Sequence, residues 1–198
     1  MSVRSKITEP DGIFFITITC YKSLRLFEVV NGYDILYKQF DILRNEGHLI
    51  CGYSAMLNHA HVLIAFSNTG KNINNRFGAL KRFMAYEIVS RLQKADRQDI
   101  LKILAEGVNA TDRKRGKLHE VLEPSFDIKE CTSREMIIQK LDYMHDNPCK
   151  GVWQLAGNPA EYQHSSARFY ITGEQGIYAV THYMELEDID LTKKKDTK

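Results

Sequence analysis

The sequence predicts an α+β fold in which helices pack on an antiparallel sheet. Three short segments at 13–20, 49–56 and 60–66 are rich in β-branched and aromatic residues, a composition typical of strands. Two longer segments at 31–47 and 71–94 repeat apolar residues at spacings of three and four, which indicates helices. The order strand, helix, strand, strand, helix matches most of a ferredoxin-like unit, so we expect the helices on one face of the sheet.

Each of these two helices has an apolar stripe that would face the sheet. In the first, Asn31 could cap the start and Gly47 the end, and the stripe consists of Ile35, Leu36, Phe40 and Leu43. In the second, the stripe consists of Ile73, Phe77, Leu80, Met84, Ile88 and Leu92. The other face of the second helix carries the cations Arg76, Lys81, Arg82 and Arg91. The pattern predicts helices that bury one side and expose the other.

Beyond residue 94 the predicted elements are shorter. Leu101, Ile103 and Leu104 indicate a short helix. The charged run 112–117 predicts a flexible loop, and a short strand is expected within 121–129. This part of the chain therefore adds little to the predicted sheet.

A further helix is predicted over residues 133–146. Thr132 and Glu135 have the spacing of a capping box at its start, and Pro148 ends it. Trp153 follows among apolar neighbours and is expected in the core.

The composition excludes few classes of function. A net charge of +2 in 198 residues neither supports nor excludes a nucleic-acid partner, because local patches matter more than the total. The four cysteines form no CxxC pair, which favours a reduced, cytoplasmic setting. No stretch approaches the roughly 20 apolar residues of a membrane helix, so no membrane partner is expected.

The segment from Asn58 to Ile64 contains the first candidate site. His59 and His61 are two residues apart in a predicted strand, so both point to the same face, while Ala60 points to the other. Two imidazoles side by side form half of a divalent-metal site. The alternative is that one histidine packs in the core and the other is solvated.

The segment from Leu141 to Pro148 offers the rest of such a site. Tyr143 and Asn147 are four residues apart and share one face of the predicted helix. If that face turns toward the histidines, the amide oxygen of Asn147 could complete the metal site beside Tyr143. A phenol with a pKa of about 10 is a poor nucleophile at neutral pH. It can attack a phosphodiester that a cation polarises and holds in line.

Three motifs together resemble the single-tyrosine HUH transposases, especially the branch that includes the REP-associated tyrosine transposases. Residues 58–64 (Asn-His-Ala-His-Val-Leu-Ile) resemble the family's His-hydrophobic-His signature. Residues 143–148 (Tyr-Met-His-Asp-Asn-Pro) resemble Tyr-Ile-His-x-Asn-Pro, and residues 159–166 (Pro-Ala-Glu-Tyr-Gln-His-Ser-Ser) resemble Pro-x-x-Tyr-x-x-Ser-Ser. The early strand, 15–19, with Phe27 after it, also fits. Their order makes the set far more specific than any one motif.

The resemblance implies a ferredoxin-like fold of the HUH endonuclease type, with a catalytic domain at 1–171. It implies a Mg²⁺ or Mn²⁺ site at His59 and His61, with Asn147 as the polar ligand. Tyr143 would attack single-stranded DNA, forming a 5′-phosphotyrosine bond and releasing a 3′-hydroxyl. Members of this family typically recognise DNA hairpins. The remainder, 172–198, would be an extension whose charged end, from Lys193 to Lys198, frays.

The sequence departs from the family pattern at two motif positions. His164 stands where relatives often have Trp before Ser-Ser, and the central residue of the histidine signature is the small Ala60. Neither change removes a chemical group that the implied reaction needs. Residues 95–130 and 172–198 match the pattern poorly.

Cations for phosphate contacts occur in two places. One is the predicted helix face with Arg76, Lys81 and Arg82; the other is the charged run with Arg113, Lys114 and Arg115. The alternative for both is an ordinary solvated surface.

Three functions compete at this point. The first is a transposase with a covalent intermediate, cytoplasmic and associated with the nucleoid. The second is a metal nuclease that activates water, with Tyr143 only structural. The third is a non-catalytic DNA-binding protein derived from a transposase. A monomer and a homodimer are both compatible with the sequence.

Overall fold

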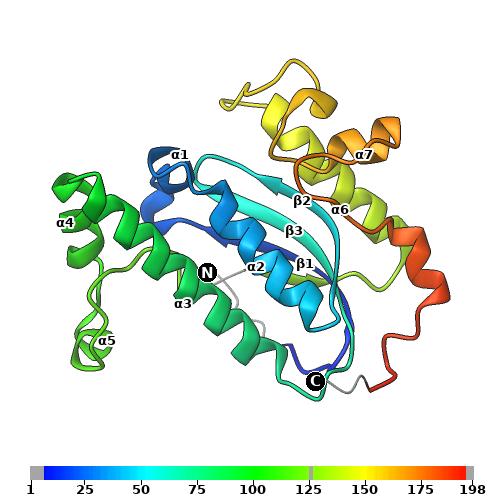
Figure 1. The fold of residues 1–198 in the computed structure, drawn as a ribbon, viewed down its shortest axis with the longest axis horizontal. Helices are drawn as coiled ribbons and strands as arrows, with labels where there is room; N and C mark the ends of the chain where they lie inside the picture. Colours follow the sequence, from blue (N-terminus) through cyan, green and yellow to red (C-terminus); the bar gives the residue numbers. More distant parts are fainter. Residues whose placement is uncertain (1–6, 125–126, 195–198) are drawn as a thin grey trace.

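The computed structural model describes residues 7–124 and 127–194 of the chain. Its centre is a four-stranded antiparallel sheet in the order β2-β3-β1-β4 (Figure 1). The strands are β1 (Gly12–Thr19), β2 (Leu49–Ala55), β3 (His59–Phe66) and β4 (Asp127–Glu130). The predicted α+β fold with an antiparallel sheet is confirmed.

Two helices cover one face of this sheet, as predicted: α2 (Tyr33–Asn45) and α3 (Ile73–Lys94) (Figure 1). All the apolar stripe residues expected on both helices are buried. They pack against the even-numbered residues of the two central strands, among them Ile16 and Val62, which are at most 1% exposed. Burial of these stripes accounts for the helices better than capping does, because most helical stability comes from packing an amphipathic face.

The predicted cap of α2 is wrong. Gly32, not Asn31, is the N-cap residue, and no side chain caps the N-terminus of α2. Asn31 has φ = 45°, a left-handed backbone conformation, whereas a capping side chain needs an extended one. Asn31 instead turns the chain between α1 (Leu26–Val29) and α2.

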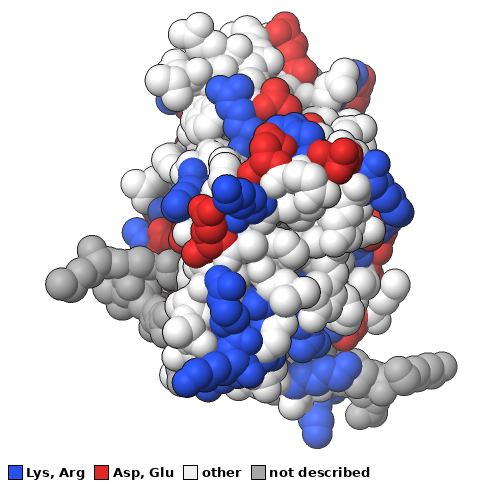
Figure 2. All heavy atoms as spheres, turned by 90° about the vertical axis from the view of Figure 1, so that its left-hand side faces the viewer, with Lys and Arg blue, Asp and Glu red and all other residues white. Residues whose placement is uncertain are grey.

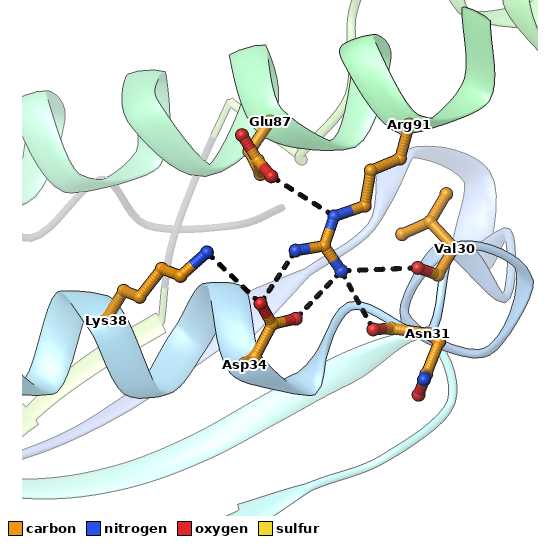
Figure 3. A network of polar contacts seen from close by, with 6 residues as sticks. All are labelled: Val30, Asn31, Asp34, Lys38, Glu87 and Arg91. Atoms are coloured by element: carbon orange, nitrogen blue, oxygen red, sulfur yellow. Dashed lines mark hydrogen bonds and ion pairs between the residues drawn. The ribbon is translucent and has the colours of Figure 1, made fainter. Parts of the chain in front are cut away.

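A polar network joins α2 to α3 on their solvent side (Figure 3). Arg91 donates two hydrogen bonds to the carboxylate of Asp34, at 2.8 and 2.7 Å, in a bidentate pair. The same guanidinium donates to the carbonyl oxygen of Asn31 at 2.9 Å and pairs with Glu87 at 3.2 Å. The Arg91 guanidinium holds the pKa of Asp34 at about 2, below its usual range. Arg91 is thus part of the α2–α3 contact.

The opposite face of the sheet is also covered, which corrects the expectation that helices lie on one face only. Helix α6 (Arg134–Asp146) packs there with α7 (Ala167–Thr172) nearby (Figure 1). Leu141 and Met144 of α6 form a second core with Phe15 and Leu63. A Cβ atom on Gly52 of β2 would lie 2.7 Å from Leu141 Cδ2, so a glycine here lets α6 approach the sheet closely.

The predicted cap of α6 is wrong by one residue. Ser133 is the N-cap residue, and its hydroxyl accepts a hydrogen bond from the Met136 amide at 3.3 Å. Thr132 lies one residue too early to reach the first free amides of the helix.

The stretch between α3 and β4 is more ordered than predicted. The expected short helix is α4 (Gln98–Glu106). The first residues of the expected flexible loop belong to another helix, α5 (Ala110–Lys114). The side chain of Asn109 caps α5 by accepting from the Asp112 amide at 2.9 Å. The strand expected within 121–129 is β4, and residues 125–126 lie outside the described part.

The C-terminal stretch packs along the sheet beside β2. The Thr181 amide donates to the Ile50 carbonyl at 2.9 Å, and Asn68 donates to the Leu191 carbonyl at 2.8 Å. The 3₁₀ helix η4 (Tyr183–Asp188) places Leu186 in the second core. Of the tail expected to fray, residues 195–198 lie outside the described part.

The described residues also form three short 3₁₀ helices: η1 (Tyr21–Ser23), η2 (Asn147–Cys149) and η3 (Pro159–Glu161). Within the described residues, none of the helices has the length and apolar character needed to cross a lipid bilayer.

Candidate active site

Two imidazoles project together from the start of β3. His59 and His61 lie on the face that carries Leu63 in the second core, while Ala60 is fully buried on the other face. Their ring centroids are 4.8 Å apart. The alternation of a strand therefore produces the predicted histidine pair.

Each histidine has a hydrogen-bond partner at Nδ1. In His61, Nδ1 lies 3.0 Å from the hydroxyl oxygen of Thr17, the residue directly opposite on β1. In His59, Nδ1 lies 2.6 Å from the amide oxygen of Asn58. When each Nδ1–H donates to its oxygen, each Nε2 keeps its lone pair. This is the arrangement by which proteins orient metal-binding imidazoles.

Burial keeps both imidazoles neutral. It lowers the pKa of His59 to about 4. Burial, together with proximity to His59 and to the positive charge of Lys140, lowers the pKa of His61 to about 3. His61 also stacks on the ring of Phe15, with centroids 5.3 Å apart and an interplanar angle of 20°. Metal binding requires a neutral imidazole, so no proton has to be removed at neutral pH.

Helix α6 brings the second motif to the same place. The Tyr143 ring lies 5.2 Å from the His61 ring and 6.2 Å from Phe15, and its side chain is 53% exposed. Asn147, one turn further along, places its amide Nδ2 at 2.9 Å from Nε2 of His61. A half-turn of the amide would present Oδ1 there instead. The four residues singled out in the sequence thus converge.

The donor set fits a divalent cation. His59 and His61 could each offer Nε2, and Asn147 could offer Oδ1. No group of three His, Cys, Asp or Glu side chains suitable for a metal occurs among residues 7–124 and 127–194. Two imidazoles and an amide leave several positions for water or phosphate oxygens, which hard cations such as Mg²⁺ and Mn²⁺ prefer.

Three side chains at this site were missed in the sequence. They are Thr17, Lys140 and Trp153. The ammonium of Lys140 lies 5.0 Å from the Phe15 ring centroid and 5.9 Å from that of Tyr143. Its position three residues before Tyr143 on the same helix is a signal that could have found it. Trp153 is only half-buried, with its ring 5.7 Å from that of His59, so the expectation that it lies in the core is wrong.

Residues of the third motif, 159–166, do not belong to the metal-binding donor set but connect the elements around it. The Tyr162 hydroxyl donates to the Ala55 carbonyl at 2.7 Å, at the end of β2. The Ser166 hydroxyl oxygen accepts from the Tyr53 amide at 2.9 Å and lies 2.8 Å from Nε2 of His145 on α6. Motif residues therefore connect β2 and α6, the elements that flank the histidine pair.

His164, the departure from the family pattern, keeps an aromatic role. Its imidazole stacks face to face on Tyr33, with centroids 3.6 Å apart and rings inclined by 6°. Nδ1 also lies 2.9 Å from the Tyr37 hydroxyl. His164 therefore supplies a planar ring at this position.

The cations predicted to contact DNA lie elsewhere, on α3 and around α5. Arg76 pairs with Glu46 at 2.5 Å, and Lys81 donates to the Glu123 carbonyl oxygen. Arg113 donates to the Ala105 carbonyl oxygen at 2.8 Å. The remaining three are exposed: Arg82, Lys114 and Arg115. The structure does not bring this set to the histidine pair.

The fold belongs to the class of α+β proteins with helices packed on an antiparallel sheet, and a solved structure shares it. The solved structure of a REP-associated tyrosine transposase bound to a REP hairpin aligns with a TM-score of 0.60 and 14% identity, over 98% of this chain and 99% of that one. At this identity the likeness shows a shared fold.

A candidate transposase from Deinococcus radiodurans R1 aligns with a TM-score of 0.40 and 17% identity, over 74% of this chain and 97% of that one. No protein-family model matches the sequence, and no curated protein matches it.

Proposed function

We propose that this protein is a transposase of the single-tyrosine HUH type, in its REP-associated branch. It would cleave and rejoin single-stranded DNA that contains a hairpin, through a 5′-phosphotyrosine intermediate and with Mg²⁺ or Mn²⁺ as cofactor. The three sequence motifs, the shared fold and the geometry of the site support the proposal. The hairpin is suggested by the REP hairpin bound in the related structure.

One observation carries the proposal. Asn147 and His61, 86 residues apart in sequence, lie 2.9 Å apart, with the Tyr143 ring 5.2 Å from the His61 ring. Burial of an apolar helix face does not require a tyrosine, an amide and two histidines to meet at one place. A nucleophile beside a cation-binding donor set is the arrangement that phosphodiester attack needs.

The metal would be held by Nε2 of His59, Nε2 of His61 and Oδ1 of Asn147. When bound, it would polarise the scissile phosphate. Thr17 and Asn58 would hold the two imidazoles in the correct tautomer.

The half-exposed Tyr143 would supply the nucleophile. Its hydroxyl oxygen loses a proton and forms a bond to phosphorus, while the bond from phosphorus to the 3′ oxygen breaks and that oxygen leaves as a hydroxyl. Rejoining reverses these steps, as a 3′-hydroxyl attacks the phosphotyrosine and the phenol is released. The ammonium of Lys140, on the same side of α6, would offset negative charge on the phosphate.

A denaturing gel tests the proposal. The protein is incubated with a single-stranded hairpin DNA and Mn²⁺, and a covalent protein–DNA band is expected. The band should disappear in Tyr143→Phe and persist in the matched control Tyr183→Phe, whose ring lies on η4 against Tyr170 and His182. His59→Ala and His61→Ala should each abolish metal-dependent cutting.

The competing functions give different results in this assay. Cleavage without an adduct that survives Tyr143→Phe would identify a nuclease that activates water. Binding without cleavage under all metal conditions would identify a non-catalytic DNA-binding protein. Either result would contradict the proposed reaction.

A further inference from the structure

A groove of about 780 Å³ lies between α3 and the chain at 115–124. One wall is the helix face that runs from Gly78 through Arg82 and Tyr86 to Gln93. The other wall is the chain between α5 and β4, from Arg115 to Leu122 and at Pro124. The groove is separate from the histidine pair, which lies on the opposite face of the sheet.

The walls expose aromatic and apolar surface. Tyr86 is 63% exposed and lines the groove, and Leu118 on the other wall is 73% exposed. Exposed aromatic rings beside a groove are the platforms on which unpaired bases stack in proteins that bind single strands.

The rim of the groove is cationic. Arg82 and Arg115 form no ion pair within the part of the chain that the structure describes. The one carboxylate deep in the groove, Glu120, is buried and paired with Lys117 at 2.6 Å. Figure 2 shows Lys and Arg side chains gathered on the lower part of the molecular end that carries α5, with Asp and Glu mainly above them. Two arginines without acidic partners are therefore available for phosphates.

The groove ends close to the strand that supports the site. The Tyr21 amide donates to the Val121 carbonyl at 2.9 Å, and the Glu123 amide donates to the Thr19 carbonyl at 2.8 Å. Thr19 is the last residue of β1 and pairs with His59 across the sheet. A strand of nucleic acid leaving the groove here would reach the end of the sheet from which the histidines project.

We propose that this groove binds an unpaired stretch of single-stranded DNA next to the segment that is cut. Arg82 and Arg115 contact phosphates, and a base stacks on Tyr86. The choice of DNA as ligand rests on the proposed function; the groove itself is a second binding surface. Duplex DNA is disfavoured because its bases are already stacked and offer no free face to Tyr86, and the cationic rim favours a polyanion over an ordinary peptide.

The test measures binding without chemistry. A fluorescein-labelled oligo(dT) of about 12 nucleotides, a length that such sites cover, is titrated in EDTA and followed by fluorescence anisotropy. All variants carry Tyr143→Phe. Tyr86→Ala should weaken binding by about tenfold, and Tyr86→Phe should retain it, because only the ring is needed for stacking.

A second pair of variants, at Gly78, tests the groove with substitutions that should not impair folding. Gly78 lies in the groove wall with no atom within 4 Å of an added Cβ, and a side chain there improves helix propensity. Gly78→Glu places a carboxylate in the groove and should weaken binding by about tenfold; the uncharged Gly78→Gln should bind within about twofold of the parent.

Two outcomes would overturn the inference: parental affinity in both Tyr86→Ala and Gly78→Glu, or competition by blunt duplex equal to that by single strand. The adduct assay with Mn²⁺ separates this inference from the proposed reaction. Loss of oligo(dT) binding in the groove variants supports the groove even if no phosphotyrosine forms. An adduct formed by a protein whose groove variants bind normally supports the reaction alone.

Discussion

The hydroxyl of Thr17 lies 3.0 Å from Nδ1 of His61, directly across the sheet from it. This contact leaves Nε2 of His61 facing Asn147 and Tyr143. A residue on the neighbouring strand thus determines which nitrogen is available at the candidate metal site. The first prediction concerns this hydrogen bond.

Thr17→Val should weaken Mn²⁺ binding by about 10- to 100-fold, because it removes the acceptor that orients His61 while keeping the side chain's shape. Thr17→Ser retains the hydroxyl and should bind nearly as the wild type. Isothermal titration calorimetry with Mn²⁺ measures both. Equal affinity in Val and Ser variants would show that the hydroxyl has no part in the site.

Asn147→Ala should weaken Mn²⁺ binding by at least about tenfold, since it removes the only oxygen donor of the proposed set. Asn147→Asp should preserve binding because a carboxylate oxygen is a good ligand for a hard cation. The same titration separates the two variants. Strong binding by Asn147→Ala would leave Asn147 as a hydrogen-bond donor to His61 only.

Lys140→Met should slow phosphotyrosine formation by about tenfold or more at saturating Mn²⁺, because it removes a positive charge close to the Tyr143 ring. Lys150→Met is the control, since that ammonium is exposed and pairs with Asp146. Single-turnover quench experiments give the rates. A rate for Lys140→Met equal to that of the control would remove Lys140 from the reaction.

The buried His145 should make stability depend on pH. Burial lowers its pKa from 6.5 to about 4, so between these values the unfolded chain binds a proton that the folded protein does not. The free energy of unfolding should therefore fall as pH decreases from 6.5 to 4. His145→Gln should reduce this slope by about 1.4 kcal/mol per pH unit, the value for one proton taken up on unfolding. Urea unfolding at several pH values measures both slopes, and identical slopes would refute the assignment.

Arg91→Met should lower the free energy of unfolding by about 1–2 kcal/mol, because it breaks the bidentate pair with Asp34 and leaves two carbonyl oxygens without their donor (Figure 3). Lys38→Met, which removes an exposed ion pair to the same carboxylate, should cost less than about 0.5 kcal/mol. Urea titration at neutral pH compares them. If the two variants lose equal stability, the network does not depend on Arg91.

Local periodicity accounts for the parts of the fold that could be predicted. The strands that become β1, β2 and β3 and the helices α2, α3 and α6 each bury a repeating apolar face, and that face is visible in a short window of sequence. The cap at Thr132 was misplaced because the neighbouring Ser133 can also cap. The cap at Asn31 was misplaced because its left-handed backbone, which the sequence pattern does not reveal, prevents its side chain from capping.

The position of α6 could not be predicted, because it depends on contacts between distant segments. Leu141 and Met144 meet Phe15 and Leu63 on the second face of the sheet, and Gly52 leaves the room they need. The missed site residues have the same origin: Thr17 becomes a partner of His61 only through the β1–β3 register, and Trp153 reaches His59 only after the chain folds back.

By itself, the sequence determined two pairs of residues that share a face of their strand or helix. His59 and His61 share a face because a strand repeats every two residues, and Tyr143 and Asn147 share a face because a helix repeats about every 3.6. Only the tertiary structure decided that the two pairs meet, with Asn147 2.9 Å from His61. The physical reason is that burial of the apolar side of α6 against the sheet sets its orientation, and no local pattern encodes which face it will cover.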